Sequence, residues 1–204
     1  TMVLCNNAHF DQEKNIFLGD PTEIALLDFA SSFGPSSKDT RLQEIPFDSK
    51  SKLMVTLNKT GNKKIAYMKG APEIIVEKCT FFLSRGRIQK LTPQKKNMLI
   101  KQYQDLAKEG QRVLAFAFKE NKLNTLSDKD FTFIGLVGMV DPIRKEVPEA
   151  ILKCHTAGIK VIMITGDHSL TAEAIARKVG IIKPGKVIII TGDELDTLDE
   201  LSLQ

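Results

Sequence analysis

The segment Asp141-Pro142-Ile143-Arg144-Lys145-Glu146-Val147 most constrains how this chain can fold, because it separates two stretches of different character. Pro142 fixes its own φ, lacks a backbone donor and moves Asp141 out of the helical region. We therefore predict a hinge here, followed by an amphipathic helix. The alternative is a plain helix N-terminus, with Asp141 or nearby polar atoms as the cap and Pro142 near the first turn.

The stretch before this segment predicts an antiparallel sheet with helices. Asp20 is placed to cap a helix whose first position suits Pro21. Further helices are expected at residues 71–78 and from Thr92-Pro93 to Gly110. Segments rich in β-forming residues predict strands at 41–47, 53–59, 64–68 and 112–119.

The stretch from residue 131 onward predicts a parallel sheet. Residues 131–140 form a near-continuous apolar run, as expected for a strand buried on both faces. Two further short strands and two helices are expected, the helices at 147–155 and 170–179 and the strands at 160–164 and 187–190. Such β-α-β-α-β alternation favours parallel strands with right-handed crossovers.

Charge and cysteine usage exclude several classes of protein. A formal net charge of +4, from dispersed basic residues, permits an anionic ligand without demanding nucleic acid, and we expect no nucleic-acid partner. Three widely spaced cysteines and three dispersed histidines give no disulfide framework and no metal cluster. The longest apolar run is about half of what a membrane-spanning helix needs. Any membrane contact is therefore expected in segments outside this chain.

Thr165-Gly166-Asp167 follows a predicted buried strand and precedes a predicted helix. Ligands of open parallel sheets bind at the carboxyl ends of strands. Gly166 lets backbone N–H groups approach a phosphate there, and the helix N-terminus favours its negative charge. We predict a phosphate site at Thr165 and Gly166, with Asp167 beside it. The alternative is an ordinary turn that Asp167 or Ser169 caps.

Four residues in the first stretch are candidates for nucleotide binding. Lys69 ends a predicted strand, where its ammonium can reach a nucleotide, and Gly70 leaves the backbone open beside it. Phe47 offers an aromatic platform for a base. Arg112 can clamp a phosphate. The alternatives are a solvated lysine, a core phenylalanine and a surface arginine. Neither a G-x-x-x-x-G-K-[S/T] loop nor a G-x-G-x-x-G turn is present.

Five motifs together resemble the cytoplasmic headpiece of P-type cation-transporting ATPases, nearest to the calcium-pump branch. They occur in the family's order over nearly the whole chain: Gly19-Asp20-Pro21-Thr22-Glu23, Pro46-Phe47-Asp48-Ser49-Lys50-Ser51-Lys52, Lys69-Gly70-Ala71-Pro72-Glu73, Asp141-Pro142-Ile143-Arg144 and Met163-Ile164-Thr165-Gly166-Asp167. Each motif alone is weak, whereas the ordered set is specific.

The resemblance implies an α/β protein with two domains. Residues 1–133 are expected to be a nucleotide-binding domain of α+β type with an antiparallel sheet, lacking its N-terminal part. Residues 134–204 are expected to be part of a phosphorylation domain with a parallel sheet and a haloacid-dehalogenase-like fold.

The resemblance also implies roles for the residues of the nucleotide site. Phe47 stacks on adenine, Glu23, Lys52 and Lys69 line the adenine pocket, and Arg112 reaches toward the phosphates. Ser49 departs from the pattern, because calcium pumps often carry arginine there.

For the phosphoryl-transfer site, the resemblance assigns Asp141 and Arg144 to the hinge and phosphate region. It assigns Thr165 and Gly166 to the transferring phosphoryl group, with Asp167 beside them. This matches the positioning and charge stabilisation that phosphoryl transfer requires.

Two segments of the family are absent from the sequence. The D-K-T-G-T segment carries the nucleophilic aspartate, and the G-D-G-x-N-D segment helps to hold Mg²⁺; neither occurs here. We therefore expect a monomeric fragment of a cation pump, from the cytoplasmic face of a membrane protein. It is expected to bind ATP without turning it over, and the full protein is expected to use Mg²⁺ and to transport a cation, with calcium favoured.

Two other hypotheses remain open at this stage. One is a soluble phosphatase of the haloacid-dehalogenase type with an inserted cap, although Asp141-Pro142-Ile143-Arg144 does not fit its D-x-D-x-[T/V] turn. The other is a nucleotide-binding module without enzymatic activity.

Overall fold

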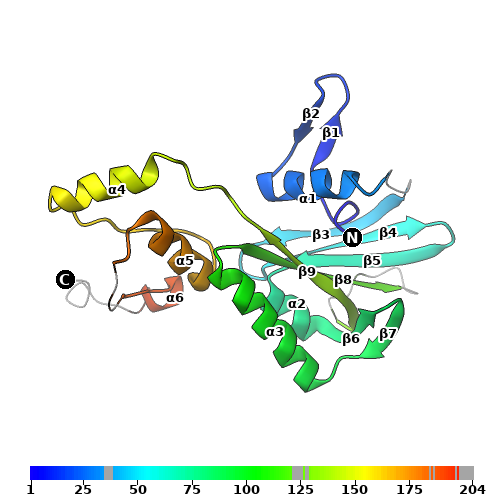
Figure 1. Ribbon diagram of the computed structural model, residues 1–204. Coiled ribbons are helices and arrows are strands. Elements are labelled where there is room, and N and C mark those ends of the chain that lie inside the picture. The colour runs from blue at the N-terminus through cyan, green and yellow to red at the C-terminus, as the bar shows by residue number, and fades with distance from the viewer. Residues whose placement is uncertain are drawn as a thin grey trace. The chain divides into compact units, whose positions relative to one another are not determined.

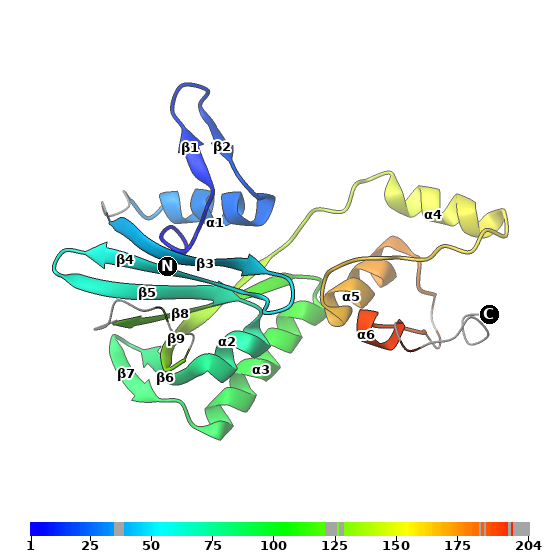
Figure 2. The same ribbon diagram turned by 180° about the vertical axis from the view of Figure 1, so that it is seen from behind.

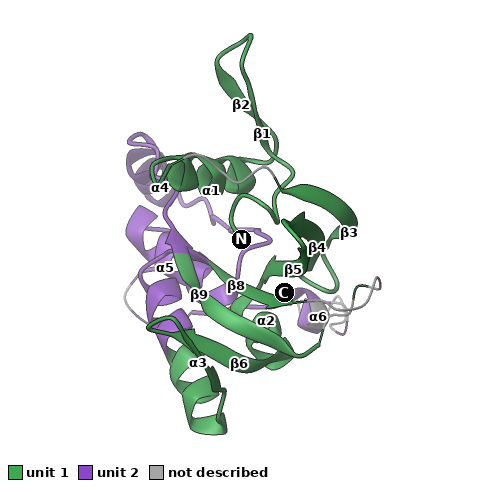
Figure 3. Ribbon diagram, turned by 90° about the vertical axis from the view of Figure 1, so that its right-hand side faces the viewer, with its two compact units in different colours: residues 1–101, 114–137 green, residues 102–113, 138–204 purple. Residues whose placement is uncertain are grey.

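The computed structural model describes residues 1–34, 39–120, 126, 129–183, 185, 187–195 and 197, apart from the side chain of Asp193. The chain divides into two compact units (Figure 3). Unit 1 comprises Thr1–Lys101 and Leu114–Val137, and unit 2 comprises Gln102–Val113 and Gly138–Gln204. The fold class is mixed α/β, as predicted.

Unit 1 is built on a seven-stranded mixed sheet with the strand order β3-β4-β5-β8-β9-β6-β7. The strands of this sheet are β3 (Thr40–Asp48), β4 (Leu53–Thr60), β5 (Lys63–Gly70), β6 (Cys79–Ser84), β7 (Arg87–Lys90), β8 (Arg112–Glu120) and β9 (Phe131–Met139). The first two residues of β8 and the last two of β9 belong to unit 2. The pairs β3–β4, β4–β5, β5–β8 and β6–β7 are antiparallel, whereas β6 and β9 are parallel. A separate antiparallel hairpin joins β1 (His9–Asp11) and β2 (Ile16–Leu18).

The first face of the sheet carries the hydrophobic core of unit 1. Alternate β4 residues Leu53, Val55 and Leu57 are buried here, because side chains of a strand alternate between its two faces. They belong to one cluster with Ile75 and Val76 of α2 (Pro72–Lys78). The cluster also takes in Leu99, from the part of α3 (Pro93–Lys108) that lies in unit 1.

The opposite face of the sheet is more polar. Met54, Thr56 and Asn58 of β4 are buried on it, each 1% exposed or less. In Figures 1 and 2, α1 (Pro21–Ser31) lies on this side of β3, β4 and β5, and α2 lies on the other. As predicted, Asp20 caps α1: its Oδ1 accepts a hydrogen bond of 2.8 Å from the Thr22 N–H. The sheet therefore separates an apolar core from a polar layer.

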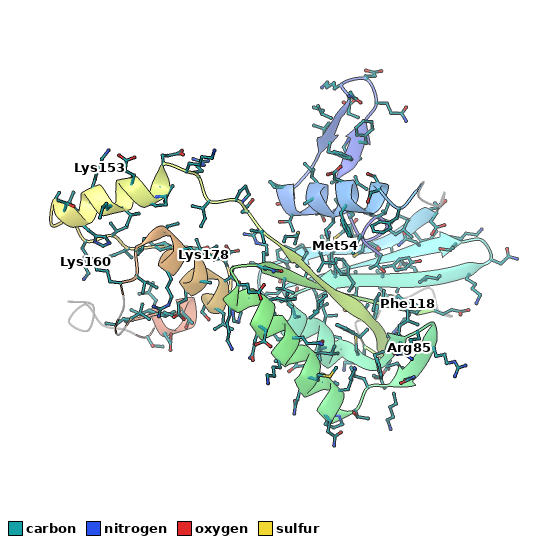
Figure 4. The ribbon with its side chains drawn as sticks, in the orientation of Figure 1. Met54, Arg85, Phe118, Lys153, Lys160 and Lys178 are labelled. Carbon is teal, nitrogen blue, oxygen red and sulfur yellow. The ribbon has the colours of Figure 1, made fainter. Side chains whose placement is uncertain are left out.

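Unit 2 contains α4 (Val147–Thr156), α5 (Ser169–Val179) and α6 (Gly192–Leu195), of which α4 and α5 lie close to the two predicted helices. Two hydrogen bonds fasten α5 to the segment before β8. Thr171 Oγ1 donates to Gln111 O at 3.0 Å, and Lys178 Nζ, labelled in Figure 4, donates to Glu109 O.

The predicted parallel sheet after residue 140 is not formed among the described residues of unit 2. Residues 160–164 and 187–190 are not strands, so these two predictions are wrong. Ile164 is 94% exposed and Ile188 is 82% exposed. A β-strand requires a neighbour for its N–H and C=O groups, and no described residues pair with either segment.

The predicted first strand of that sheet, residues 131–140, is β9 instead. It pairs in parallel with β6 in the mixed sheet of unit 1. Only its first three residues are buried, so burial on both faces along the whole run was also wrongly predicted.

The segment around Pro142 is an exposed connection rather than a helix start. Residues 140–144 have no regular structure, and α4 begins at Val147 with Pro148 near its first position. The hinge remains a prediction, whereas a helix N-terminus at Pro142 was wrong. Within the described part of the chain, no helix combines the length and apolar character that a membrane span requires.

Candidate functional site

The end of β5 brings three predicted site residues together. Lys69 pairs with Met54, which Figure 4 labels, and Gly70 pairs with Leu53 across the β4–β5 ladder. A Cβ on Gly70 would lie 2.3 Å from the Lys52 carbonyl oxygen, which also accepts a hydrogen bond of 3.0 Å from the Ala71 N–H. Only glycine fits between these backbones, so Gly70 sets the close approach of Lys52 to the end of β5.

Lys69 is a buried charge with a partner. Its ammonium forms an ion pair with Glu23 Oε1, and the two side chains are only 7% and 15% exposed. Glu23 lies in the first turn of α1, where the helix N-terminus favours a carboxylate. The solvated-lysine alternative for Lys69 is therefore wrong. A buried ion pair whose partners come from a strand end and a helix start fixes both elements relative to each other.

A neutral thiol adjoins this ion pair. Burial raises the pKa of Cys5 to about 11, and the nearby Lys69 charge acts in the opposite direction. The thiol of Cys5 donates to Met54 O at 3.5 Å. Because Cys5 stays protonated at neutral pH, Glu23 is the anion that compensates Lys69.

Phe47 lies in an irregular part of β3. Ile45 pairs with Val55 and Asp48 pairs with Leu53, so β3 has one more residue than β4 between these pairs. Such a bulge re-aims side chains, and Phe47 is 62% exposed. The core-phenylalanine alternative is therefore wrong.

The turn after Phe47 leads into Lys52 and is fixed by Asp48. The Asp48 carbonyl accepts from the Lys52 N–H at 2.7 Å, and its carboxylate accepts from the N–H groups of Lys50 and Ser51. Lys52 has a positive φ of 52° and an exposed side chain. An exposed phenylalanine and an exposed lysine thus flank a hydrogen-bonded turn, and the carbonyl of Lys52 lies against the end of β5 at Gly70 and Ala71.

An apolar cavity elsewhere in unit 1 contains none of these residues. Its volume is about 390 Å³, and its lining includes Phe29, Phe33, Phe116, Ile134 and Leu136. A lining without charged side chains offers no partner to a phosphate, so we do not assign this cavity to a nucleotide.

Within unit 2, Arg112 and Asp167 form an ion pair. The Arg112 Nε and Nη2 atoms both donate to Asp167 Oδ1, at 3.0 and 2.5 Å. Thr165 belongs to the same cluster, because its Oγ1 accepts from the Asp167 N–H at 3.1 Å. Arg112 is therefore an exposed arginine, 49% exposed at its side chain, that is paired at the predicted phosphate turn, and its phosphate contact stays a prediction.

The remaining predicted residues of unit 2 are not drawn into this cluster. Gly166 is exposed, and a Cβ there would contact nothing within 4 Å. Asp141 and Arg144 lie on the exposed connection before α4. No hydrogen bond or ion pair of their side chains occurs within the described residues.

The cap of α5 was missed by the sequence analysis. His168, and not Asp167 or Ser169, is the N-cap residue: its Nδ1 accepts from the Leu170 N–H at 3.3 Å. Its ring also meets the ring of Tyr103 edge to face, 5.4 Å between centroids. Histidine is an unusual cap, and the contact with Tyr103 joins residues far apart in the sequence, so no local signal pointed to it.

Comparison with known proteins supplies the family context. Residues 1–146 match the family model described as P-type ATPase, cytoplasmic domain N. A calcium-transporting ATPase 1 of Lactococcus lactis is 41% identical over 100% of this chain and 24% of its own length. A calcium-transporting ATPase 1 of Saccharomyces cerevisiae is 44% identical over 97% of this chain and 22% of its own length.

More distant relatives carry other cations in their names. A potassium-transporting ATPase alpha chain 2 of Rattus norvegicus is 38% identical over 89% of this chain and 20% of its own length. The chain thus spans between 20% and 24% of the length of these relatives.

Proposed function

Because the chain belongs to the P-type ATPase family, with residues 1–146 matching its cytoplasmic domain N, we propose that it binds ATP for a cation-transporting ATPase. Residues 1–133 form the nucleotide-binding domain in this proposal, and residues 134–204 form part of the phosphorylation domain. The chain presents the γ-phosphate to an aspartate that lies outside it, and the chain alone does not turn ATP over.

The buried Lys69–Glu23 pair at a glycine-restricted strand end carries this proposal. Phe47, exposed on its bulge, supplies a face on which adenine stacks. Lys52 and Lys69 supply cations, Glu23 accepts hydrogen bonds, and Gly70 keeps the backbone close.

The Arg112–Asp167 pair supports the assignment of the phosphate end. Arg112 exchanges its carboxylate partner for phosphate oxygens when nucleotide is bound. Thr165 and Gly166 then hold the transferring phosphoryl group, while Asp141 and Arg144 serve the hinge that brings the phosphorylation segment to ATP. These roles require positioning and charge stabilisation only.

Mg²⁺ enters this proposal together with ATP. Among the described residues, no group of three or more His, Cys, Asp or Glu side chains is placed to hold a metal ion. In this proposal the metal arrives on the phosphates, where it neutralises charge, and its protein ligands lie mainly outside this chain.

We propose calcium as the transported cation, since the relatives of higher identity are named as calcium-transporting ATPases. Transport takes place in membrane segments outside this chain, with the present residues on the cytoplasmic side. The isolated chain is a monomer in this proposal.

An ATP and ADP titration followed by NMR tests the nucleotide site. We expect a dissociation constant at about the millimolar level, roughly −4 kcal/mol, because Phe47 and Lys52 are exposed to water. Phe47→Ala and Lys69→Ala each abolish binding, whereas Phe10→Ala and Lys63→Ala, which alter an exposed phenylalanine and an exposed lysine elsewhere, leave it unchanged.

Turnover assays decide between this proposal and the phosphatase hypothesis. Hydrolysis of a generic phosphate ester by this chain, abolished by Asp141→Asn, would establish the phosphatase. Absence of nucleotide binding by a folded chain, as judged by circular dichroism, would reject the ATP site.

A further inference from the structure

The carboxylate of Glu23 is held at both of its oxygens. Lys69 occupies Oε1, and the backbone N–H of Asn7 donates to Oε2 at 3.1 Å. Each carboxylate oxygen has two acceptor positions, so Glu23 retains capacity for a ligand donor. The direction of its remaining lone pairs depends on where the Asn7 backbone lies.

The Asn6-Asn7 turn is not part of a strand and is fixed by side chains. Asn6 is 4% exposed, and its Nδ2 donates to both Met2 O and Glu23 O at 2.9 Å. Its Oδ1 accepts from the Ala8 N–H at 2.8 Å. These bonds hold Asn6 in place. The side chain of Asn7 and the carbonyl groups of the turn accept hydrogen bonds from other donors.

Arg41 supplies those donors from β3. Its Nη2 donates to Leu4 O at 3.1 Å and to Asn6 O at 2.5 Å. Its Nη1 donates to Asn7 Oδ1 and to Glu44 Oε2. One guanidinium therefore contacts three residues of the N-terminal segment, in the fork geometry that only arginine offers.

Glu44 completes the arrangement. Its Oε2 accepts from Arg41 at 2.9 Å, and its Oε1 accepts from Asn7 Nδ2 at 2.9 Å. Arg41 and Glu44 are 31% and 26% exposed at their side chains. The ion pair alone is therefore screened, and its value lies in orienting Asn7 rather than in charge attraction.

We propose that Arg41 is a positioning residue for base selection, acting through Asn7 on the carboxylate of Glu23. The proposal rests on the proposed function, in which Glu23 lines the base pocket. The hydrogen bonds of the Arg41 side chain go to Leu4, Asn6, Asn7 and Glu44 and not to Glu23 or Lys69. A fixed carboxylate accepts from the exocyclic amine of adenine, whereas guanine presents an acceptor oxygen at that position. The orientation of Glu23 thus favours ATP over GTP.

Nucleotide titrations of the full chain test this, with ATP and GTP as the probes. Arg41→Ala is expected to weaken ATP binding about fivefold to tenfold, as loss of hydrogen bonds to a charged group does. GTP binding is expected to change by less than about twofold, so the ATP preference falls. Lys63→Ala, which breaks an exposed ion pair on β5, is the matched control and is expected to change neither.

A double-mutant cycle separates positioning from general destabilisation. If Arg41 acts through Glu23, then Arg41→Ala lowers the ATP preference in the wild-type background but not in the Glu23→Gln background. Arg41→Lys, which keeps the charge without the fork, is expected to restore part of the preference. Should Arg41→Ala fail to fold, Asn7→Ala takes its place, because it keeps the N–H donor to Glu23 and removes the bonds to Arg41 and Glu44.

The outcomes distinguish the two proposals. If wild type does not bind ATP, or Glu23→Gln has no effect, the nucleotide site fails and this inference fails with it. If wild type and Glu23→Gln behave as expected but Arg41→Ala lowers ATP and GTP affinity equally, or acts like Lys63→Ala, only this inference is overturned. Where Asn7→Ala replaces Arg41→Ala, an equal loss of ATP and GTP affinity, or behaviour like that of Lys63→Ala, likewise overturns only this inference.

Discussion

Lys69 and Phe47 depart in opposite directions from the usual behaviour of their residue types. Lysine is almost never fully buried, yet Lys69 is 6% exposed, and a large aromatic is normally covered, yet Phe47 is 62% exposed. The buried ammonium of Lys69 requires a counter-charge, which is the carboxylate of Glu23. The exposure of Phe47 requires a structural cause, which is the bulge in β3.

Gly70→Ala tests the close approach at the end of β5. The new Cβ would lie 2.3 Å from a backbone oxygen that cannot move cheaply. We expect a loss of about 1–3 kcal/mol in the free energy of unfolding, with ATP binding weakened as well. Gly135→Ala, where a Cβ contacts nothing within 4 Å, is the control in urea unfolding. Equal effects of the two substitutions would contradict the steric explanation.

The buried thiol of Cys5 predicts a loss of stability in alkaline solution. Burial raises its pKa from the ordinary value of 9.0 to about 11. Between these values the unfolded chain has released the proton and the folded chain retains it, so stability falls as the pH rises from 9 to 11. We expect roughly 2 kcal/mol of this fall to disappear in Cys5→Ala. Denaturant unfolding at pH 8, 9, 10 and 11 measures the free energy of unfolding of the wild type and of Cys5→Ala. An equal fall of this free energy with pH in the two proteins would refute the prediction.

The helices and strands of unit 1 follow from local signals. The Asp20-Pro21 pair, the turn at Gly61 with its φ of 60° and the alternation along β4 each act within a few residues. The β1–β2 hairpin was not predicted. Its loop lacks a glycine, and the positive φ of 52° falls on Asn15 instead.

The elements that were wrongly predicted depend on distant partners. Residues 160–164 and 187–190 have the apolar composition of buried strands, but composition cannot provide a neighbouring strand. The same limit applies to the site. The motifs predicted Glu23 and Lys69 separately, whereas their ion pair and the cap at His168 arise from tertiary packing.

Asp20→Ala tests the link between the start of α1 and the site. It removes the cap bond to the Thr22 N–H, which is expected to cost about 1 kcal/mol. Because Glu23 lies in the same helical turn, ATP binding should weaken too. Asp28→Ala, an exposed aspartate later in α1, should change neither property. Melting temperatures and ATP titrations of the two variants provide the comparison.

At the scale of the whole molecule, the two units differ in how regularly their backbone N–H and C=O groups are hydrogen-bonded. The β4–β5 ladder of unit 1 runs through eight consecutive residue pairs from Leu53↔Gly70 to Thr60↔Lys63. In unit 2, residues 160–166 belong to no helix or strand. The two stretches therefore differ in the work required to open them locally.

Amide hydrogen exchange is expected to reflect this difference. Amides of residues 54–58 should exchange only on global unfolding of unit 1, whereas those of residues 161–165 should exchange at least about a thousandfold faster. Exchange measured by NMR at neutral pH makes the comparison. Protection of residues 161–165 equal to that of β4 would mean that these amides have partners after all.

The parallel pairing of β6 with β9 has a consequence for the order of folding. Cys79 of β6 pairs with Phe131 of β9, which lies far downstream in the sequence, so β6 gains this neighbour only after β9 has been synthesised. By contrast, β4 and β5 are joined by a short turn. Closing the long intervening loop costs more chain entropy than closing a hairpin. During synthesis the β3-β4-β5 meander can therefore assemble first. One edge of β6 stays open until the residues of β9 leave the ribosome, which makes this edge the place where premature association with another chain is most probable.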